Sequence, residues 1–390
     1  MKTAWEELLA CLPQPPAYQY DWEALSRTAL SRFFAEMART QQNPFWHGEG
    51  DVWTHTRMVC EALTSLEEFR TLNERRRQIA ALAALLHDIG KIPTTRLEDG
   101  AWTSPNHGAV GAHMAREVLW KEFGVCGTEE KQRFREAVCL LIQHHMRPDY
   151  ILDDDKSELK MLRIAASSEL MPEFDWSMLC LIAQADVLGR IYEKTDEQVE
   201  TVLLCRELAG ETGCLHGAGE YASEYTKRAY LSGRNVWRGQ PLFEDCWGEV
   251  TLMCALPGTG KDTWIGRHCQ GMPMVSLDAL RLEMGVAPTD NQGVVIQAGM
   301  EKARVHLRAK REFVFNATNM TSATRGKLVQ LFENYGARVR IVFLETAWEE
   351  NLSRNAGRRA VVPQKAIERM LGSLEVPQRM EAQTVEWICV

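Results

Sequence analysis

The sequence lacks three features that would place the protein outside a reducing, aqueous compartment. Its 11 cysteines include no C-x-x-C pair, so neither a zinc ribbon nor a framework of disulfides is expected. It has no run of about 18 apolar residues that could span a bilayer. The first residues, MKTAWEELLACLPQPP, do not show the charged-then-apolar pattern of a secretion signal. We therefore expect a cytoplasmic protein that does not interact with membranes.

Charged residues are divided unevenly between two parts of the chain. The 390 residues are 45% apolar, which is enough for one large hydrophobic core or for two. From Trp247 onward 18 Lys and Arg accompany 15 Asp and Glu, whereas the residues before it contain 27 against 38. The first part is therefore acidic and the second weakly basic, which indicates two units with different tasks. A weakly basic unit suits a nucleic-acid partner without establishing one.

Hydrophobic spacing also changes along the chain. From Tyr20 to about Leu231 the apolar residues recur at helical intervals, as in RRRQIAALAALLHDIG, and no period-2 strand is evident. An aperiodic stretch with Gly and Pro, residues 231–248, forms the natural boundary. The predicted organisation is an N-terminal helical extension (1–44), an all-α domain (45–235), a linker (236–248) and a second domain (249–390).

In the second domain short apolar runs alternate with amphipathic segments. Strands are expected at VTLMCAL, PMVSLD, FVFNAT and RVRIVFLE, with helices that start near Asp262, Asp278, Asp290 and Thr321. This alternation is typical of an α/β fold, in which helices cover both faces of a parallel sheet.

The first of these strands leads into the turn PGTGK and then into a helix. In such a P-loop, backbone N–H groups face the phosphates of a nucleotide and Lys261 reaches the β- and γ-phosphates. The match to G-x-x-x-x-G-K-[ST] is imperfect, because Ala255 replaces the first glycine and Asp262 replaces the final Ser or Thr. The expected nucleotide-binding residues of this loop are Pro257, Gly258, Thr259, Gly260, Lys261, Asp262 and Thr263.

Further charged residues follow the later strands. Since ligands of open α/β sheets bind at the carboxyl ends of the strands, Asp278 in VSLDALR should lie opposite the P-loop. It can accept the proton of an attacking hydroxyl, and Arg281, one helical turn on, can hold a phosphate of the acceptor. The alternative is that Asp278 only caps its helix. Arg354 and Arg358, four residues apart, form either a solvated basic face or a lid over the γ-phosphate.

The motifs P-G-x-G-K-x-T, D-x-x-R and R-N-x(2)-R-x(4)-P together resemble the kinase module of polynucleotide 5′-hydroxyl kinases. The resemblance implies that Asp278 is the general base and that Arg281 binds the 3′-phosphate of the acceptor. It also implies that Arg354 and Arg358 hold ATP, or another nucleoside triphosphate, bound with Mg²⁺. Together with Lys261, these arginines and Asp278 would be the catalytic residues of the kinase.

Two positions depart from the usual pattern of such kinases. Asp262 occupies the position of the magnesium-binding hydroxyl, and the third strand ends at Asn316, where a carboxylate is common. We therefore expect Asp262 to engage the magnesium through its water shell and to replace the charge that Asn316 lacks. Alternatively, Asp262 is an acidic residue favoured in the first turn by the helix dipole.

Seven of the ten histidines lie between residues 47 and 145. His87 and Asp88 end an apolar helix, ALAALLHDIGK, and other His and Asp residues occur on further apolar segments. Imidazoles and carboxylates are costly to bury unless they coordinate something. The candidate metal ligands are His55, His87, Asp88, His107, His145 and Asp186. Such a mixed set favours a transition metal, namely Mn, Fe, Co, Ni or Zn.

This series, with H-D-I-G-K and A-D-V-L-G-R, resembles the HD phosphohydrolase superfamily, an all-α fold, over most of the first domain. The resemblance implies the branch with two divalent metals, which activate a bridging water and neutralise the phosphate. Asp88 would bridge the metals as a catalytic residue, and Lys91 and Arg147 are candidate phosphate contacts. His113 and His144 are open between a structural and a functional role.

A phosphohydrolase followed by a polynucleotide-kinase-like module resembles the HD-Pnk family of bacterial enzymes that heal broken nucleic-acid ends. The resemblance implies that the HD domain removes a 2′-, 3′- or 2′,3′-cyclic phosphate. The kinase would phosphorylate the 5′-hydroxyl of RNA or DNA, and a separate ligase would join the ends.

Two alternatives remain open on the sequence. The protein could be a nucleoside or sugar kinase fused to an HD nucleotidase, or an ATP-gated regulator whose HD domain is a switch. Arg281 argues against both, because it prepares a phosphate site on the acceptor. RNA or DNA as the substrate, the donor triphosphate and the native metal are likewise open.

Overall fold

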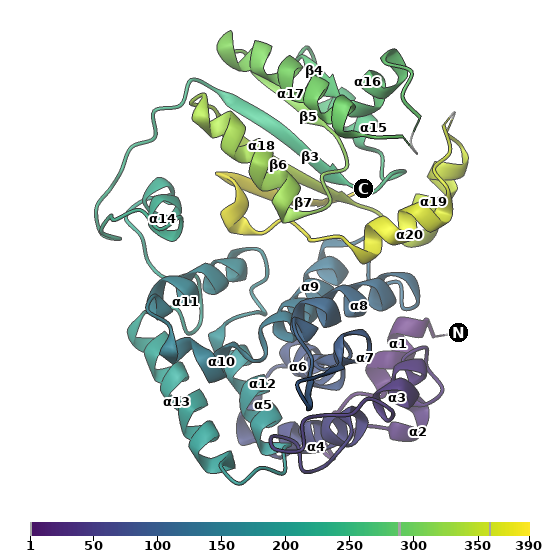
Figure 1. Ribbon diagram of the computed structural model, residues 1–390, viewed down its shortest axis with the longest axis vertical. Helices are drawn as coiled ribbons and strands as arrows, with labels where there is room; N and C mark the ends of the chain where they lie inside the picture. The colour runs from purple at the N-terminus through teal and green to yellow at the C-terminus, as the bar shows by residue number, and fades with distance from the viewer. Residues whose placement is uncertain (1, 288–289, 359) are drawn as a thin grey trace. The chain divides into compact units, whose positions relative to one another are not determined.

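The computed structural model describes residues 2–287, 290–358 and 360–390. The chain forms two compact units, Met1–Cys126 with Glu130–Glu220 and Gly127–Glu129 with Tyr221–Val390. The first unit is helical and the second is built around a parallel sheet (Figure 1). Among the described residues, no helix combines the length and the apolar character that crossing a membrane requires.

Helices make up almost all of the regular structure of the first unit. They are α1 (Ala4–Ala10), α2 (Trp22–Leu25), α3 (Ser31–Met37), α4 (Val52–Ser65), α5 (Glu67–Thr71), α6 (Glu74–Leu86), α7 (Lys91–Thr94), α8 (His107–Lys121), α9 (Glu129–His144), α10 (Arg147–Tyr150), α11 (Ser157–Ala165), α12 (Trp176–Leu188) and α13 (Thr195–Glu211). The all-α prediction is confirmed for the fold class of this unit.

Three helices carry much of the apolar core and most of the candidate metal ligands. The helices α4, α6 and α12 begin after Asp51, Asn73 and Asp175, whose side chains each accept a hydrogen bond from a backbone N–H of the first turn. Every residue from Ile79 to Leu86 of α6 is buried. A helix that is apolar on all sides belongs in a core, so polar groups at its end are held in a dry environment.

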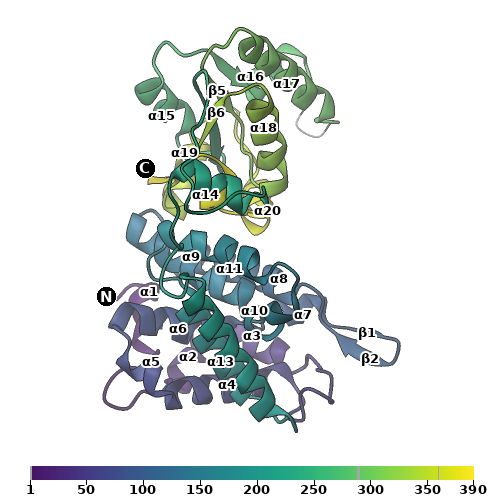
Figure 2. The same ribbon diagram turned by 90° about the vertical axis from the view of Figure 1, so that its left-hand side faces the viewer.

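The first unit also contains a short antiparallel hairpin that the sequence analysis did not predict. Strands β1 (Arg96–Glu98) and β2 (Ala101–Thr103) pair Arg96 with Thr103 and project from the helices (Figure 2). Asp99 and Gly100 form the turn with φ of 50° and 82°, as expected of a two-residue hairpin loop. The expectation of no strand in this part was therefore wrong.

The second unit is built on a five-stranded parallel sheet. Its strands are β3 (Glu249–Ala255), β4 (Met274–Ser276), β5 (Phe313–Asn316), β6 (Arg338–Glu345) and β7 (Thr384–Cys389), in the spatial order β4-β5-β3-β6-β7. Its helices are α14 (Glu224–Leu231), α15 (Lys261–His268), α16 (Leu277–Glu283), α17 (Gly293–Arg308), α18 (Ser322–Asn334), α19 (Trp348–Ala356) and α20 (Gln364–Gly372). The α/β prediction is confirmed, although the edge strand β7 was not foreseen.

Helices cover both faces of this sheet, as Figure 2 shows for α15 on one side and α18 on the other. Strand β5 shows how the alternation of side chains serves both faces. Val314 packs in one cluster with Trp264 and Ile265 of α15. Its neighbours Phe313 and Phe315 contact the ring of Phe332 on α18. The centre of the sheet is therefore buried on both sides, which fixes the loops at the carboxyl ends of its strands.

Candidate metal and nucleotide sites

Four buried histidines converge in the core of the first unit. His55 comes from α4, His87 follows α6, His107 begins α8 and His145 follows α9. The Nδ1 atom of each faces an oxygen acceptor, and the acceptors are Glu49 Oε1 at 2.9 Å, Ala84 O at 2.8 Å, Ser104 O at 2.8 Å and Ile142 O at 2.7 Å, in that order. Because these oxygens only accept, each Nδ1 carries a proton, and Nε2 of a neutral ring presents its lone pair to the centre.

The Nε2 atoms approach one another in two pairs. Those of His55 and His87 are 3.3 Å apart, and those of His107 and His145 are also 3.3 Å apart. Burial lowers the pKa of His107, and burial together with the adjacent imidazoles of His107 and His87 lowers the pKa of His145 to about 3. Both rings are therefore neutral, and two lone pairs at this distance repel unless a cation lies between them.

Asp88 lies between the two pairs. Its Oδ2 is 3.2 Å from His87 Nε2, while its Oδ1 is 3.4 Å from His107 Nε2. Both oxygens are buried, and neither accepts a hydrogen bond of good geometry from the described residues. A buried carboxylate without hydrogen bonds is costly, so both oxygens favour cations beside them, and metal ions would fit here in addition to the ammonium group of Lys91.

Asp186 of α12 completes the first pair. Its Oδ1 is 3.0 Å from His55 Nε2 and 3.9 Å from His87 Nε2. Burial opposes ionisation of His55, but Asp186 and Glu49 outweigh burial and raise the pKa of that imidazole. A cation bound to His55 Nε2 would therefore displace a proton. All six histidines and aspartates predicted as metal ligands lie together in this cluster.

Two cations balance the carboxylates of the cluster. Lys91 Nζ is 2.8 Å from Asp88 Oδ2, and Arg190 forms an ion pair with Asp186 four residues before it in the chain. Burial alone would raise the pKa of both aspartates, yet these cations and the nearby histidines hold each pKa well below its usual range. Arg190 lies just past the C-terminus of α12 and had no role in the sequence-based prediction.

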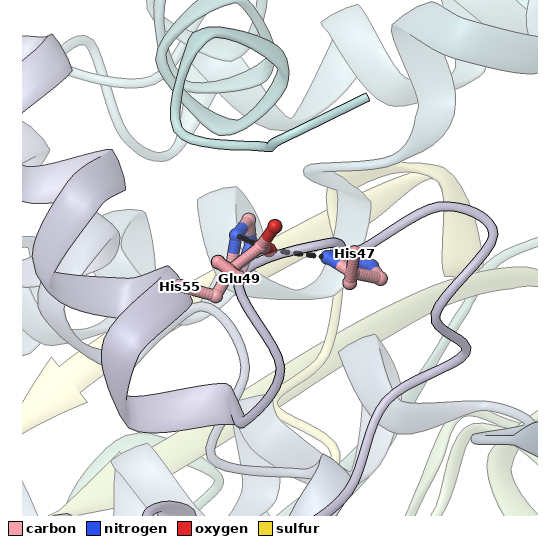
Figure 3. Close-up of side chains that lie close together, drawn as sticks. All are labelled: His47, Glu49 and His55. Atoms are coloured by element: carbon pink, nitrogen blue, oxygen red, sulfur yellow. Dashed lines mark hydrogen bonds and ion pairs between the residues drawn. The ribbon is translucent and has the colours of Figure 1, made fainter. Parts of the chain in front are cut away.

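Glu49 and His47 form a second layer behind His55. Glu49 Oε1 accepts from His47 Nδ1 at 2.8 Å and lies 2.9 Å from His55 Nδ1, as the dashed lines in Figure 3 mark. Its Oε2 accepts from the backbone N–H of Ile191 at 2.9 Å. Burial raises its pKa, but these hydrogen bonds outweigh burial and hold the pKa well below the usual range. An ionised Glu49 fixes the ring orientation of His55 and makes it a stronger ligand.

A cavity of ≈ 520 Å³ opens onto the metal-binding cluster. Asp88, Lys91, His107, His145, Asp186 and Arg190 line its inner end. Lys91 donates to Gln42 Oε1 at 2.7 Å and lines the cavity, and its role as a phosphate contact stays a prediction. Arg147 is exposed and does not line this cavity. His144, whose pKa burial lowers to about 4, also lies outside the cluster, as does the half-buried His113.

In the second unit the P-loop has the backbone conformation that cradles phosphates. Gly258 and Gly260 have φ of 88° and 96°, values that residues other than glycine rarely adopt. A Cβ at Gly258 would lie 2.7 Å from Asn351 O. Lys261 is the first residue of α15. Burial lowers the pKa of its amine, while Asp278 and Asp262 oppose that shift.

Helix α19 donates two hydrogen bonds to backbone carbonyls of the P-loop. Asn351 Nδ2 donates to Pro257 O at 2.9 Å, and Arg354 Nη1 donates to Thr259 O at 3.2 Å. Asn351 was not singled out in the sequence, where a polar residue on an amphipathic helix carries no distinctive signal. A cavity of ≈ 690 Å³ beside the loop is lined by Thr259, Gly260, Thr263 and Arg354, among others.

Asp278 is not the residue that caps its helix. The N-cap of α16 is Ser276, whose side chain accepts from Ala279 N. Asp278 is thereby left to contact Arg281 Nη1, and Arg358 Nη2 lies 4.0 Å from its Oδ2. Its side chain remains 66% exposed, so a substrate hydroxyl can reach it. The residues predicted for the acceptor therefore lie near Arg358 of the predicted lid.

Asp262 and Asn316 contact each other directly. Asn316 Nδ2 donates to Asp262 Oδ1 at 2.7 Å. The two positions that depart from the usual kinase pattern are therefore a hydrogen-bonded pair at the mouth of the P-loop. Such a pair keeps one negative charge beside the place where a nucleotide-bound Mg²⁺ is expected.

Two family models match the chain, each over one unit. The HD domain model matches residues 52–171, and the AAA domain model matches residues 250–377. Among solved structures, a gluconokinase from Sinorhizobium meliloti 1021 is similar at 21% identity over 36% of this chain and 82% of that chain, with a TM-score of 0.28. The chain therefore carries an N-terminal HD hydrolase domain with a buried histidine–aspartate metal-binding cluster, followed by a P-loop kinase-like domain of the AAA type.

Proposed function

We propose that the protein heals nucleic-acid ends, with the kinase-like domain phosphorylating a 5′-hydroxyl and the HD domain removing a 2′-, 3′- or 2′,3′-cyclic phosphate. The kinase half of this proposal rests on Asp278, which does not cap its helix, is exposed and lies between Arg281 and Arg358. An acceptor that itself bears a phosphate explains a second arginine beside the base better than a neutral sugar does.

In the proposed transfer, Asp278 accepts the proton of the 5′-hydroxyl while that oxygen attacks the γ-phosphorus. The bond from the γ-phosphorus to the bridging oxygen breaks, and the nucleoside diphosphate leaves. Lys261 and the backbone N–H groups of Gly258 to Gly260 hold the β- and γ-phosphates. Arg354, fixed on Thr259 O, and Arg358 stabilise the charge that develops on the transferred group.

In the HD domain, His55, His87, Asp88 and Asp186 would hold one metal ion and His107, His145 and Asp88 the other. Bound metals of this kind supply a hydroxide at neutral pH and neutralise the phosphate. The protein contributes orientation, because each histidine is fixed through Nδ1. Lys91 lies beside Asp88 and would bind a phosphate oxygen of the substrate.

The test of the kinase half is transfer from γ-labelled ATP with Mg²⁺ to a panel of acceptors. The panel holds a 5′-hydroxyl oligonucleotide, a nucleoside 3′-phosphate, the matching nucleoside and gluconate. We expect the oligonucleotide and the nucleoside 3′-phosphate to be labelled far better than the other two. Arg281→Gln should raise KM for the 3′-phosphorylated acceptors and leave the weak labelling of the nucleoside unchanged.

Preferential labelling of the nucleoside or of gluconate would contradict the proposal and favour a small-molecule kinase. Absence of transfer to every acceptor, together with nucleotide-dependent changes in HD activity, would favour the regulator. The HD half is tested separately, by release of phosphate from oligonucleotides with 3′-phosphate or 2′,3′-cyclic phosphate ends in the presence of each candidate metal.

A further inference from the structure

Two exposed aromatic side chains, Phe45 and Trp46, form a cluster with the half-buried Tyr192 on the HD domain, and we call this cluster the aromatic platform. The ring centroids of Phe45 and Trp46 are 4.8 Å apart, and those of Trp46 and Tyr192 are 4.9 Å apart. Phe45 is 65% exposed and Trp46 is 42% exposed. Exposed apolar groups gathered in this way commonly mark a binding surface.

The aromatic platform is rigid, because two loops are joined beneath it. Gly48 N donates to Ile191 O at 3.0 Å, and Ile191 N donates to Glu49 Oε2 at 2.9 Å. A Cβ at Gly48 would lie only 2.9 Å from Ile191 O, so only glycine permits this approach. A surface that is already ordered binds a partner with a smaller loss of conformational entropy.

The aromatic platform reaches the cavity of the metal-binding cluster. Trp46 lines the same cavity as Asp88, His145, Lys91 and Arg190. The cavity therefore combines metal-binding groups and two cations, which suit a phosphate, with a flat aromatic wall. A ligand that fits this combination carries an anionic phosphate ester and, within a few ångströms of it, a flat uncharged group.

We infer that the aromatic platform stacks the nucleobase of the terminal nucleotide whose phosphate the HD domain hydrolyses. This inference rests on the proposed function and deepens it, because it names how the hydrolase half holds a single-stranded end. Aromatic side chains stack on every base. Stacking alone does not distinguish the bases, so the HD domain should bind ends of any base with similar affinity.

The test compares two short single-stranded oligonucleotides with a 3′-phosphate, identical except that one lacks the terminal base. Phosphate release by the metal-loaded full-length protein is measured together with binding, by anisotropy of a 5′-labelled oligonucleotide. For the complete end, Trp46→Ala should raise KM and the Kd roughly fivefold or more. For the base-free end the same substitution should change either constant less than twofold, because no stacking is lost.

Two further variants separate stacking from a general effect on the fold. Trp46→Phe keeps an aromatic face and should restore most of the affinity for the complete end. Phe243→Ala removes an aromatic side chain that is 90% exposed in the other unit, and it should leave both constants unchanged. Tyr192→Ala should act in the same direction as Trp46→Ala and to a smaller extent, because Tyr192 does not line the cavity.

Three other outcomes would contradict the inference. If Trp46→Ala weakens the binding of both oligonucleotides equally, or of neither, the aromatic platform does not stack the base. The proposed function would still stand in that case if the wild type hydrolyses nucleotide ends. If the wild type neither binds nor hydrolyses either oligonucleotide, the aromatic platform and the proposed hydrolase function fail together. A preference for one base by more than tenfold would contradict recognition by stacking alone.

Discussion

At the scale of single residues, Glu49 shows how much of the metal-binding cluster depends on groups behind the ligands. Its carboxylate accepts from both His47 and His55 and from a backbone N–H. Removing the charge leaves the shape of the site and weakens the basicity of one ligand. The expected effect is therefore on metal affinity rather than on folding.

We expect Glu49→Gln to weaken binding of the metal ion held by His55 by about 10- to 100-fold, with a smaller loss for His47→Ala, which leaves the Glu49–His55 contact in place. The measurement is bound metal after dialysis against graded chelator concentrations. Glu193→Gln, a change at an exposed carboxylate of the same region, is the matched control. Unchanged metal retention in Glu49→Gln would show that this carboxylate is dispensable for the site.

The Asp262–Asn316 pair is the second single-residue case. Asp262→Ala should strongly weaken magnesium-dependent kinase turnover, and Asp262→Ser should restore part of it, because a hydroxyl can bind Mg²⁺ directly. Asn316→Asp alone would set two carboxylates face to face across a hydrogen-bond distance of 2.7 Å, which is unfavourable. The double variant Asp262→Ser/Asn316→Asp should therefore turn over faster than Asn316→Asp alone.

The measurement is initial rate against magnesium concentration for the wild type, for the single variants Asp262→Ala, Asp262→Ser and Asn316→Asp, and for the double variant. Asp262→Ser, Asn316→Asp and the double variant form a double-mutant cycle. A positive coupling energy in this cycle would show that the two residues contribute to the same function. Magnesium dependence that is the same in Asp262→Ala as in the wild type would instead make Asp262 an acidic first-turn residue favoured by the helix dipole.

At the scale of elements, the P-loop is constrained by its backbone and by helix α19. Gly258→Ala would place a methyl group 2.7 Å from Asn351 O at a φ of 88°. Strain of this kind costs about 1–3 kcal/mol and displaces the N–H groups that face the phosphates. We expect a loss of about tenfold or more in kinase kcat/KM, with the HD activity unchanged.

Gly266→Ala provides the matched control for this prediction. Gly266 lies in the middle of α15, and a Cβ there meets nothing within 4 Å. Because alanine favours a helix over glycine by about 0.5–1 kcal/mol, this variant should be as active as the wild type and slightly more resistant to heat. If Gly258→Ala retained full kinase activity, the loop geometry would not be needed for the transfer.

The elements also show what sequence alone could predict. The strands β3 to β6 and the starts of α15, α16 and α18 were foreseen within a few residues, since apolar runs and turn signals coincide there. The hairpin β1–β2 was not, because its two strands have only three residues each and no buried face. Strand β7, at the edge of the sheet, was also missed, although its six residues make it longer than β4 and β5.

The candidate metal site was predictable for a different reason. Each ligand stands on an apolar helix segment or close to the end of one, where a polar side chain is conspicuous. Glu49 and His47 lie in a polar loop, NPFWHGEGD, where charged residues are ordinary, so their burial became apparent only from the fold. Asn351 was hidden in the same way, because its hydrogen bond to Pro257 O joins positions 94 residues apart.

At the scale of the whole molecule, the central expectation is that the chain contains two separate active sites. The candidate metal ligands all lie in the first unit, and the candidate kinase residues all lie in the second. The two sites share no residue, so a substitution in one site should abolish only the activity of that site. Asp88→Ala should abolish phosphate release and lower bound transition metal, and Asp278→Ala should abolish transfer from ATP to a 5′-hydroxyl.

The comparison is made with each variant, with the two variants mixed in equal amounts, and with protein stripped by chelator and returned to Mg²⁺ alone. Asp88→Ala should keep wild-type kinase activity, and Asp278→Ala should keep wild-type phosphate release. The mixture should perform both reactions on one oligonucleotide that carries a 5′-hydroxyl and a 3′-phosphate, because a released product can reach the other protein.

The stripped protein should retain only the kinase activity, since Mg²⁺ prefers oxygen ligands and a histidine-rich site favours transition metals. Loss of both activities in either single variant would mean one composite site, and phosphate release in Mg²⁺ alone would exclude the transition-metal assignment.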